Sequence, residues 1–230
     1  MKIGIIVLCR FSSSRLPGKI LMEIAGDTLL NGIIKRLSKS KHHLPIVVAT
    51  SNHHTDDILE EYCLDNNIEV FRGSLDNVAN RFLSCAQAYE MDYAVRINGD
   101  NLFTDPGILD EMVEIALKNR YDFISNVEGR TFPHGMSVEI VRMRFYADIV
   151  ERFDGVDLRE HVTLYLYETP ELGKRVYYKN QGCPFKGQIQ VAIDTIADVE
   201  MAEKIISFTS KSFIDLTYCE IVDIYKSLNK

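Results

Sequence analysis

Apolar positions along the chain follow two spacings, and the alternation between them predicts the order of strands and helices. Short continuous apolar runs such as residues 3–8 are typical of strands buried on both faces of a sheet. Apolar residues that recur three or four positions apart, as in 29–37, are typical of helices with one buried face. The predicted strands are 3–8, 45–50, 68–71, 92–97, 121–126, 138–141, 175–179 and 188–193, and the predicted helices are 29–37, 56–66, 77–89, 106–119, 198–208 and 218–228.

This order of elements predicts an α/β fold of the Rossmann-like kind. Up to residue 119 each strand is followed by a helix, and such an alternation forms a mostly parallel sheet flanked by helices. A Pro-x-Gly turn at 133–135 precedes 138–141, which we expect to join the sheet antiparallel. Thr55 is the expected N-cap of the helix at 56–66. Because no repeat, low-complexity tract or linker interrupts the pattern, we expect a single domain over 1–230.

The polar segment between the first strand and the first helix carries the most chemistry. It covers 9–19 and reads Cys-Arg-Phe-Ser-Ser-Ser-Arg-Leu-Pro-Gly-Lys. Its three cations and three hydroxyls suit phosphate oxygens, although a basic turn in solvent has a similar composition. Its position favours a ligand site, because parallel sheets bind ligands at the carboxyl ends of their strands. The P-loop of nucleoside triphosphatases is excluded, since Ser13 and Ile20 stand where that motif needs Gly and Ser or Thr.

A second polar segment follows the predicted strand at 92–97. It contains Asn98, Gly99 and Asp100, and it is expected at the same edge of the sheet as 9–19. A Gly-Asp pair on its own is equally common in turns. The shared edge favours a role for the Asp100 carboxylate in the same site.

Composition narrows the class of function. The formal net charge of −7 argues against a general nucleic-acid binder, so an anionic ligand would be held by local cations. The five cysteines form no CxxC pair, which favours a reducing cytoplasm over a zinc site or a disulfide framework. No apolar run approaches the roughly 18 residues of a membrane span, and no signal peptide is apparent. The pairs at 42–43 and 53–54 are expected to be surface histidines rather than metal ligands.

Several motifs together resemble one enzyme family. The pattern Arg-x-x-Ser-x-Arg-Leu-Pro-Gly-Lys at 10–19 looks like the signature loop of the sugar cytidylyltransferases, and Arg-Glu-His-Val-Thr at 159–163 and Asp-Thr at 194–195 are similar to further family motifs. The resemblance is greatest to the spore-coat polysaccharide biosynthesis protein F family, which is related to the 3-deoxy-manno-octulosonate (Kdo) and acylneuraminate enzymes. His134 and Ser137 depart from it, because the family has carboxylates there, and Ile196 replaces its proline.

The resemblance implies roles for individual residues. The implied nucleotide-binding residues are Leu8, Arg10, Ser13, Ser14, Arg15, Lys19 and Asn98, and the implied catalytic residues are Arg10, Arg15, Lys19 and Asp100. Asp100 and Asp194 would bind Mg²⁺. Glu139, Arg159 and His161 would contact the acceptor, although the sequence alone equally allows a structural histidine at the start of a helix for His161.

The implied reaction is cytidylyl transfer. CTP would activate an acidic 2-keto sugar of the Kdo or nonulosonic type, giving a CMP-sugar and pyrophosphate for polysaccharide or glycan synthesis. The resemblance also implies a nucleotide-diphospho-sugar transferase type of fold and a homodimer. From the composition we expect a cytoplasmic protein with no nucleic acid or membrane as partner. A sugar-1-phosphate nucleotidyltransferase that uses another triphosphate, or a non-catalytic nucleotide-binding module of the same fold, are the alternatives.

Overall fold

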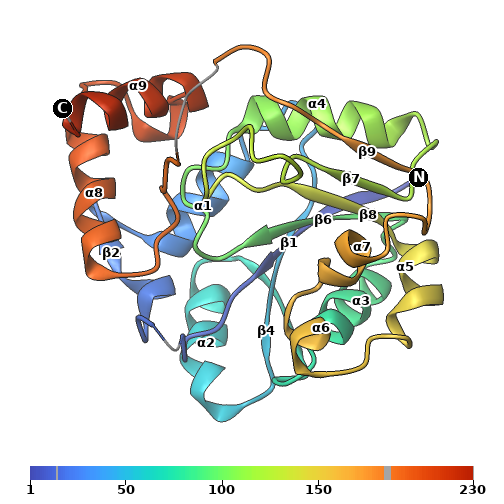
Figure 1. Cartoon of the computed structure of the whole chain (residues 1–230). Coiled ribbons are helices and arrows are strands. Elements are labelled where there is room, and N and C mark those ends of the chain that lie inside the picture. Colours follow the sequence, from blue (N-terminus) through green and yellow to red (C-terminus); the bar gives the residue numbers. More distant parts are fainter. Residues whose placement is uncertain (14, 184–187, 230) are drawn as a thin grey trace.

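A seven-stranded sheet forms the centre of the molecule, in the order β5, β4, β1, β6, β8, β7, β9 (Figure 1). The computed structural model describes residues 1–13, 15–183 and 188–229. The strands are β1 (Ile3–Leu8), β4 (Ile46–Ser51), β5 (Glu69–Gly73), β6 (Tyr93–Asn98), β7 (Phe123–Ser125), β8 (Glu139–Arg142) and β9 (Arg175–Tyr177). Every neighbouring pair is parallel except those of β8, which is antiparallel to both β6 and β7. The predicted mostly parallel sheet with an antiparallel strand at 138–141 is confirmed.

Helices cover both faces of this sheet. One face carries α1 (Leu29–Leu37), α2 (Asp57–Asp65), α4 (Pro106–Leu117), α8 (Ile196–Ser207) and α9 (Tyr218–Leu228), and the other carries α3 (Val78–Ala88), α5 (Met143–Val150), α6 (Val156–Glu160) and α7 (Leu164–Glu168). In β1, Ile3, Ile5 and Val7 are buried in the first layer, and Ile6 and Leu8 in the second. Because successive side chains of a strand point to opposite faces, a continuous apolar run is what a strand covered on both sides requires.

The strand order changes direction beside β1. After β1 the chain builds outward through β4 and β5, and then returns to place β6 on the other side of β1. Leu8 and Asn98 are paired in register, so the two loops that follow them leave the sheet together. Gly99 permits this, because a Cβ there would lie 2.4 Å from the Cβ of Cys9. Open α/β sheets bind ligands at such a switch point.

The start of α2 differs from the prediction. A 3₁₀ helix, η2 (His54–Asp56), precedes α2, so Thr55 lies inside a helical turn and its predicted role as N-cap is wrong. The side chain of His53 accepts a hydrogen bond from the Thr55 N–H instead. The helical segment therefore begins at His54, before residue 56, where the helix was predicted to begin.

The segment 188–193 is not a strand, and that prediction is wrong. Ile189, Val191 and Ile193 alternate and are buried, but the segment forms only an isolated bridge, between Gln190 and His134. The alternation reflects burial against the 133–136 turn rather than pairing in the sheet.

Three helices between 143 and 168, α5, α6 and α7, were not predicted. α5 follows β8 with no intervening loop, and Arg142 gives it no side-chain cap, so the usual signals of a helix start are missing. His161, for which the sequence allowed a position at the start of a helix, is the C-cap residue of α6.

A buried arginine of α1 links this helix to the segment that precedes α9. Arg36 of α1 is fully buried and donates to the carbonyl oxygens of Thr104 (3.1 Å), Phe213 and Leu216 (2.9 Å). Burial lowers the pKa of Arg36 to about 10. Across the described ranges, no helix is both long and apolar enough to cross a membrane.

Candidate active site

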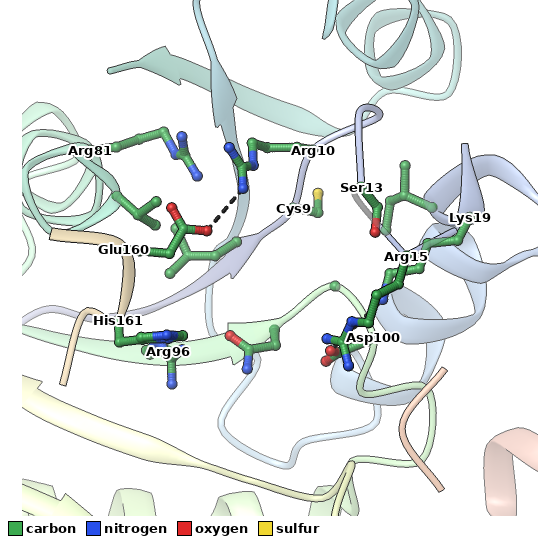
Figure 2. A pocket seen from close by; sticks show the side chains of 15 residues that line it. Cys9, Arg10, Ser13, Arg15, Lys19, Arg81, Arg96, Asp100, Glu160 and His161 are labelled. Atoms are coloured by element: carbon green, nitrogen blue, oxygen red, sulfur yellow. Dashed lines mark hydrogen bonds and ion pairs between the residues drawn. The ribbon is translucent and has the colours of Figure 1, made fainter. Parts of the chain in front are cut away.

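A pocket of about 250 Å³ opens at the switch point, where the carboxyl ends of β1 and β6 meet (Figure 2). Its lining comes from the loop after β1, the end of β6 with the Gly99-Asp100 turn, the first turns of α3, and Glu160 and His161 at the end of α6. The predicted location of the site, at the carboxyl edge beside β1, is therefore occupied by a pocket.

The loop after β1 is shaped by its own backbone. The amides of Ser13 and Gly18 both donate to the carbonyl oxygen of Phe11, at 2.9 and 2.8 Å. Gly18 has φ +75°, a conformation that favours glycine, and it leads directly into the 3₁₀ helix η1 (Lys19–Leu21). This fold turns Lys19 back toward the sheet and buries most of its side chain.

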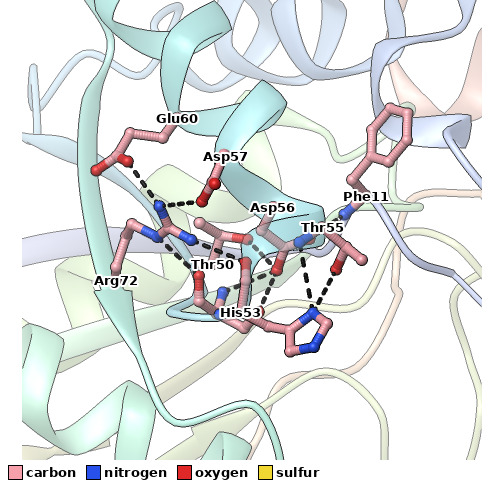
Figure 3. A network of polar contacts seen from close by, with 9 residues as sticks. Phe11, Thr50, His53, Thr55, Asp56, Asp57, Glu60 and Arg72 are labelled. Atoms are coloured by element: carbon pink, nitrogen blue, oxygen red, sulfur yellow. Dashed lines mark hydrogen bonds and ion pairs between the residues drawn. The ribbon is translucent and has the colours of Figure 1, made fainter.

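A buried carboxylate anchors the same loop to the neighbouring strand (Figure 3). Asp56 is fully buried and accepts hydrogen bonds from the Phe11 N–H at 2.8 Å, the Thr50 hydroxyl at 2.9 Å, and the N–H and hydroxyl of Ser51. Burial alone would raise the pKa of Asp56, but the hydrogen bonds from Ser51, Phe11 and Thr50 outweigh it and hold the pKa below its ordinary value. Asp56 is therefore an ionised anchor for the start of the loop.

Lys19 and Arg15 meet two carboxylates at one side of the pocket. The Lys19 Nζ lies 2.9 Å from Asp194 Oδ1 and 3.9 Å from Asp100 Oδ2, and it donates to the Ile193 carbonyl oxygen at 2.6 Å. Arg15 Nη1 lies 2.7 Å from Asp194 Oδ2, and its side chain is 64% exposed. The structure thus brings Asp100 and Asp194 together around one ammonium group.

The Asp100 carboxylate has an unused oxygen. Its Oδ1 is buried without a hydrogen-bond partner in the described part of the chain, and burial raises its pKa while Lys19 opposes the shift. Two converging carboxylates with a free oxygen fit a hard divalent cation such as Mg²⁺, which prefers oxygen ligands and commonly completes its shell with water and phosphate. The residues present therefore suit the predicted metal.

The other side of the pocket is rich in guanidinium groups. Arg10 Nη2 donates to Glu160 Oε1 at 2.9 Å. Arg81 of α3 is buried beside it and donates from Nη1 to the Ser74 carbonyl oxygen at 2.7 Å. Burial lowers the pKa of Arg81, and the nearby Arg10 cation lowers it further.

A buried network lies behind this guanidinium side. Arg96 of β6 and Glu139 of β8 are directly opposite in register, and their side chains form an ion pair. Glu139 also accepts hydrogen bonds from the hydroxyls of Thr163 at 2.8 Å and Tyr167 at 2.6 Å. Burial, followed by the Glu139 charge, raises the pKa of Tyr167, so this phenol remains a donor. The network ties the segment that carries Glu160 and His161 to the sheet.

The predicted site residues fall into three groups. Those that line the pocket are Leu8, Arg10, Ser13, Arg15, Lys19, Asn98, Asp100 and His161, and Asp194 contacts two of them. Glu139 is buried behind Arg96, and Arg159 is exposed on α6 outside the lining. Ser14 lies outside the described residues. All their assigned roles stay predictions.

Sequence reasoning missed several polar residues of the site. Arg81, Arg96 and Glu160 line the pocket without having been assigned a role there, and Asp56 anchors its loop. A signal existed for Arg96, because it lies two positions before Asn98 on the same face of a predicted strand. Arg81 lies within a predicted helix, and no local signal distinguishes it from a solvated arginine.

A family model described as cytidylyltransferase matches residues 4–223. The chain belongs to the cytidylyltransferase family. It is 35% identical over 204 residues to the spore coat polysaccharide biosynthesis protein SpsF of Bacillus subtilis. The matched region covers 85% of this chain and 82% of SpsF. It is 34% identical over 205 residues to the uncharacterized protein MJ1063 of Methanocaldococcus jannaschii, with 87% and 82% coverage.

One solved structure agrees with this family, and a second shares the fold. A cytidylyltransferase from Leptospira borgpetersenii superposes with a TM-score of 0.92 at 33% identity, covering 100% of this chain and 95% of that one. A CMP:2-keto-3-deoxy-manno-octonic acid synthetase complexed with CTP gives a TM-score of 0.65 at 12% identity, with 90% and 99% coverage, and so shares the fold. The predicted kinship with the SpsF and Kdo cytidylyltransferase families is confirmed, and so is the nucleotide-diphospho-sugar transferase type of fold.

Proposed function

We propose that this cytidylyltransferase uses CTP to activate an acidic 2-keto sugar of the Kdo or nonulosonic type, giving a CMP-sugar and pyrophosphate. The observation that carries the proposal is the contact of Lys19 with both Asp100 and Asp194 inside a pocket at the switch point. Nucleotidyl transfer depends on positioning and on neutralising phosphate charge, and a fixed ammonium group beside two carboxylates that would hold Mg²⁺ supports both roles.

The reaction exchanges one bond to phosphorus for another. A sugar hydroxyl oxygen attacks the α-phosphorus of CTP, the bond from that phosphorus to the bridging oxygen of the β-phosphate breaks, and pyrophosphate leaves. The hydroxyl proton passes to water. Lys19 stabilises the charge that develops at the α-phosphate, since its ammonium group is held in place by Ile193 and Asp194. Arg15 is exposed enough to turn from Asp194 to the outer phosphates.

Asp100 and Asp194 are the residues that would hold Mg²⁺. When bound, the ion would neutralise the triphosphate and lower the pKa of the attacking hydroxyl. The free Oδ1 of Asp100 supports this assignment.

The acceptor is assigned to the side of the pocket opposite Lys19. His161 lines the pocket there and can donate to a sugar oxygen or carboxylate. Arg159 is exposed two residues earlier and would have to turn inward to take part, and Glu139 would act from behind Arg96.

The test is pyrophosphate release, measured with each of the four nucleoside triphosphates against Kdo, N-acetylneuraminate, neutral sugars and sugar 1-phosphates. We expect turnover with CTP and an acidic 2-keto sugar, and none without Mg²⁺. Turnover confined to a sugar 1-phosphate would replace the acceptor assignment. Activity with another triphosphate and none with CTP would contradict the base assignment.

We further propose that the protein acts as a homodimer in the cytoplasm and supplies a precursor for polysaccharide synthesis. The proposal rests on kinship with SpsF, whose name places that relative in spore coat polysaccharide biosynthesis. Sedimentation equilibrium checks the dimer, for which a mass of twice 26.3 kDa is expected.

A further inference from the structure

The guanidinium of Arg96 is held on one side and has an unused edge on the other. Nη1 pairs with Glu139, while Nε is shut off from solvent and has no hydrogen-bond partner among the residues described. The side chain is 14% exposed and lines the pocket, so a ligand there reaches Nε only when the guanidinium shifts toward the pocket. An interior donor without a partner is destabilising, so the free energy of the protein falls when an acceptor is supplied. The Nε–Nη2 edge is the planar fork that matches a carboxylate through two parallel hydrogen bonds.

We infer that Arg96 binds the carboxylate of the acceptor through this edge, and that Glu139 is the positioning residue that fixes the guanidinium for it. The inference rests on the proposed function, because it takes the acceptor to be an acid. Arg96 lies two residues before Asn98 on the same face of β6, which places the two Cα atoms about 7 Å apart. Arg96 and His161 both line the pocket, on the side opposite Lys19 and Asp100 in Figure 2.

Glu139 is built to hold Arg96 rather than to meet the ligand. Its side chain is 3% exposed, and Thr163 and Tyr167 donate to the oxygen that does not face Arg96. With both oxygens occupied, the carboxylate is fixed on three sides. A fixed partner reduces the conformational freedom that Arg96 would lose on binding an anion. This arrangement explains a buried acid in a site whose substrates are anionic.

The charge balance of the pocket favours an anion beyond these internal pairs. Five cationic side chains line the pocket: Arg10, Arg15, Lys19, Arg81 and Arg96. Four carboxylates contact these cations: Asp100, Asp194, Glu139 and Glu160. The phosphate-binding cations Arg15 and Lys19 lie around Asp194, away from Arg96. A separate fork at the far side suits a second, planar anion, which is the carboxylate of the acceptor.

The kinetic test compares Arg96→Gln with wild type in the CTP-dependent pyrophosphate assay, using Kdo and N-acetylneuraminate. Loss of a charge-assisted pair predicts an acceptor KM raised by roughly 10- to 100-fold, while the KM for CTP stays within about twofold. Arg96→Lys keeps the charge and loses the fork, so it should recover only part of the affinity. An unchanged acceptor KM, or an equal rise in both KM values, overturns the inference.

Two further variants separate binding from folding. Arg142→Gln is the matched control, because Arg142 also pairs with a carboxylate, Asp122, but lies at the opposite end of β8, and its acceptor KM should not change. Arg96→Met combined with Glu139→Gln removes both buried charges while leaving an amide oxygen for Thr163 and Tyr167. It should stay folded and show the same acceptor defect as Arg96→Gln. Glu139→Gln alone should raise the acceptor KM and leave the CTP KM unchanged, as expected of a positioning residue.

If wild type shows no turnover, that result contradicts the proposed function but does not test carboxylate binding by Arg96. A binding measurement then tests the inference. The Nε–Hε NMR signal of Arg96 is assigned by its absence in Arg96→Gln, and sodium pyruvate serves as the smallest 2-keto acid. We expect this signal to shift with pyruvate and not with neutral pyruvamide. No shift with pyruvate, or a larger shift with inorganic phosphate, overturns the inference.

Discussion

Lys19 joins parts of the chain that are far apart in sequence. Its ammonium group contacts Asp100 from the end of β6 and Asp194 before α8, while its backbone begins η1. The side chain is only 11% exposed, so these contacts hold its position before any substrate arrives. A preorganised cation of this kind stabilises developing charge without moving at the moment of reaction.

Replacing Lys19 with Ala should lower kcat by about 10²- to 10³-fold, the usual loss when one preorganised donor is removed. Lys41→Ala is the control of equal charge change, because Lys41 is 61% exposed and pairs with Glu114 at 3.2 Å on the surface. Steady-state pyrophosphate release measures both. A folded Lys19→Ala protein with near-normal turnover would remove Lys19 from the catalytic residues.

Replacing Asp56 with Ala should loosen the loop and destabilise the fold. The amides of Phe11 and Ser51 would lose their buried acceptor, at about 1–3 kcal/mol for each unsatisfied group. We expect a higher KM for CTP, together with a lower urea midpoint. Asp56→Asn keeps one acceptor oxygen and should lie between the two. An unchanged CTP KM in Asp56→Ala would mean that the anchor does not control the loop.

The pH dependence of stability follows from the same carboxylate. The pKa of Asp56 is depressed in the folded protein from an ordinary value of 3.8. Its contribution to stability is therefore fully present above about pH 3.8 and is lost as the pH falls through the folded pKa. Urea titrations between pH 5 and 2 should show wild type losing stability more steeply than Asp56→Asn. Parallel curves would contradict this.

At the scale of elements, helices with an apolar stripe were easier to predict than the cap at Thr55 or the connections between elements. The helix at 218–228 was predicted with its observed limits, and in the structure a capping box of Thr217 and Glu220 begins it. α5 could not be found in the same way, since β8 runs into it without a cap or a turn. The alternation at 188–193 indicated a strand, yet burial against a turn produces the same pattern. Local sequence reports which side chains are buried, and it does not report which partner covers an apolar side chain.

The capping box of α9 gives a prediction of its own. Hydrogen bonds from Lys211 and Thr217 lower the pKa of Glu220 to about 2, against an ordinary value of 4.5. The stabilisation is present above pH 4.5 and disappears as the pH falls toward 2. Glu220→Gln should therefore be less stable than wild type at pH 6, and the gap in urea midpoint should close by pH 2. A gap that persists at pH 2 would assign the effect to packing.

At the scale of the whole molecule, the site depends on elements from both ends of the chain. The candidate residues at 10–19 and 98–100 were predicted together, because both follow parallel strands. The contacts of Arg96, Arg81 and Glu160 depend on how β8, α3 and α6 are packed, which is a property of the complete fold. Arg36 adds a long-range tie, since it joins α1 to the carbonyl groups that precede α9.

Replacing Arg36 with Ala should lower the free energy of unfolding by about 4 kcal/mol, because three buried carbonyl groups would lose their donor. Lys39→Ala is the matched control on the same side of the molecule, where its surface pair with Asp215 at 2.9 Å should contribute less than about 1 kcal/mol. Urea unfolding followed by circular dichroism measures both. An equal decrease in the free energy of unfolding for both variants would mean that the buried hydrogen bonds of Arg36 stabilise the protein no more than a surface ion pair does.

The distance in sequence between Lys19 and Asp194 has a consequence during translation. The two residues are 175 positions apart, and the Lys19 ammonium also needs the Ile193 carbonyl. While a ribosome is still making the last fifth of the chain, all seven strands of the central sheet can already have left the exit tunnel, but the loop after β1 lacks the carboxylate of Asp194 that contacts Lys19. In a nascent chain Lys19 therefore lacks its contacts with Ile193 and Asp194, and its ammonium group acquires a fixed position only when 193–194 dock.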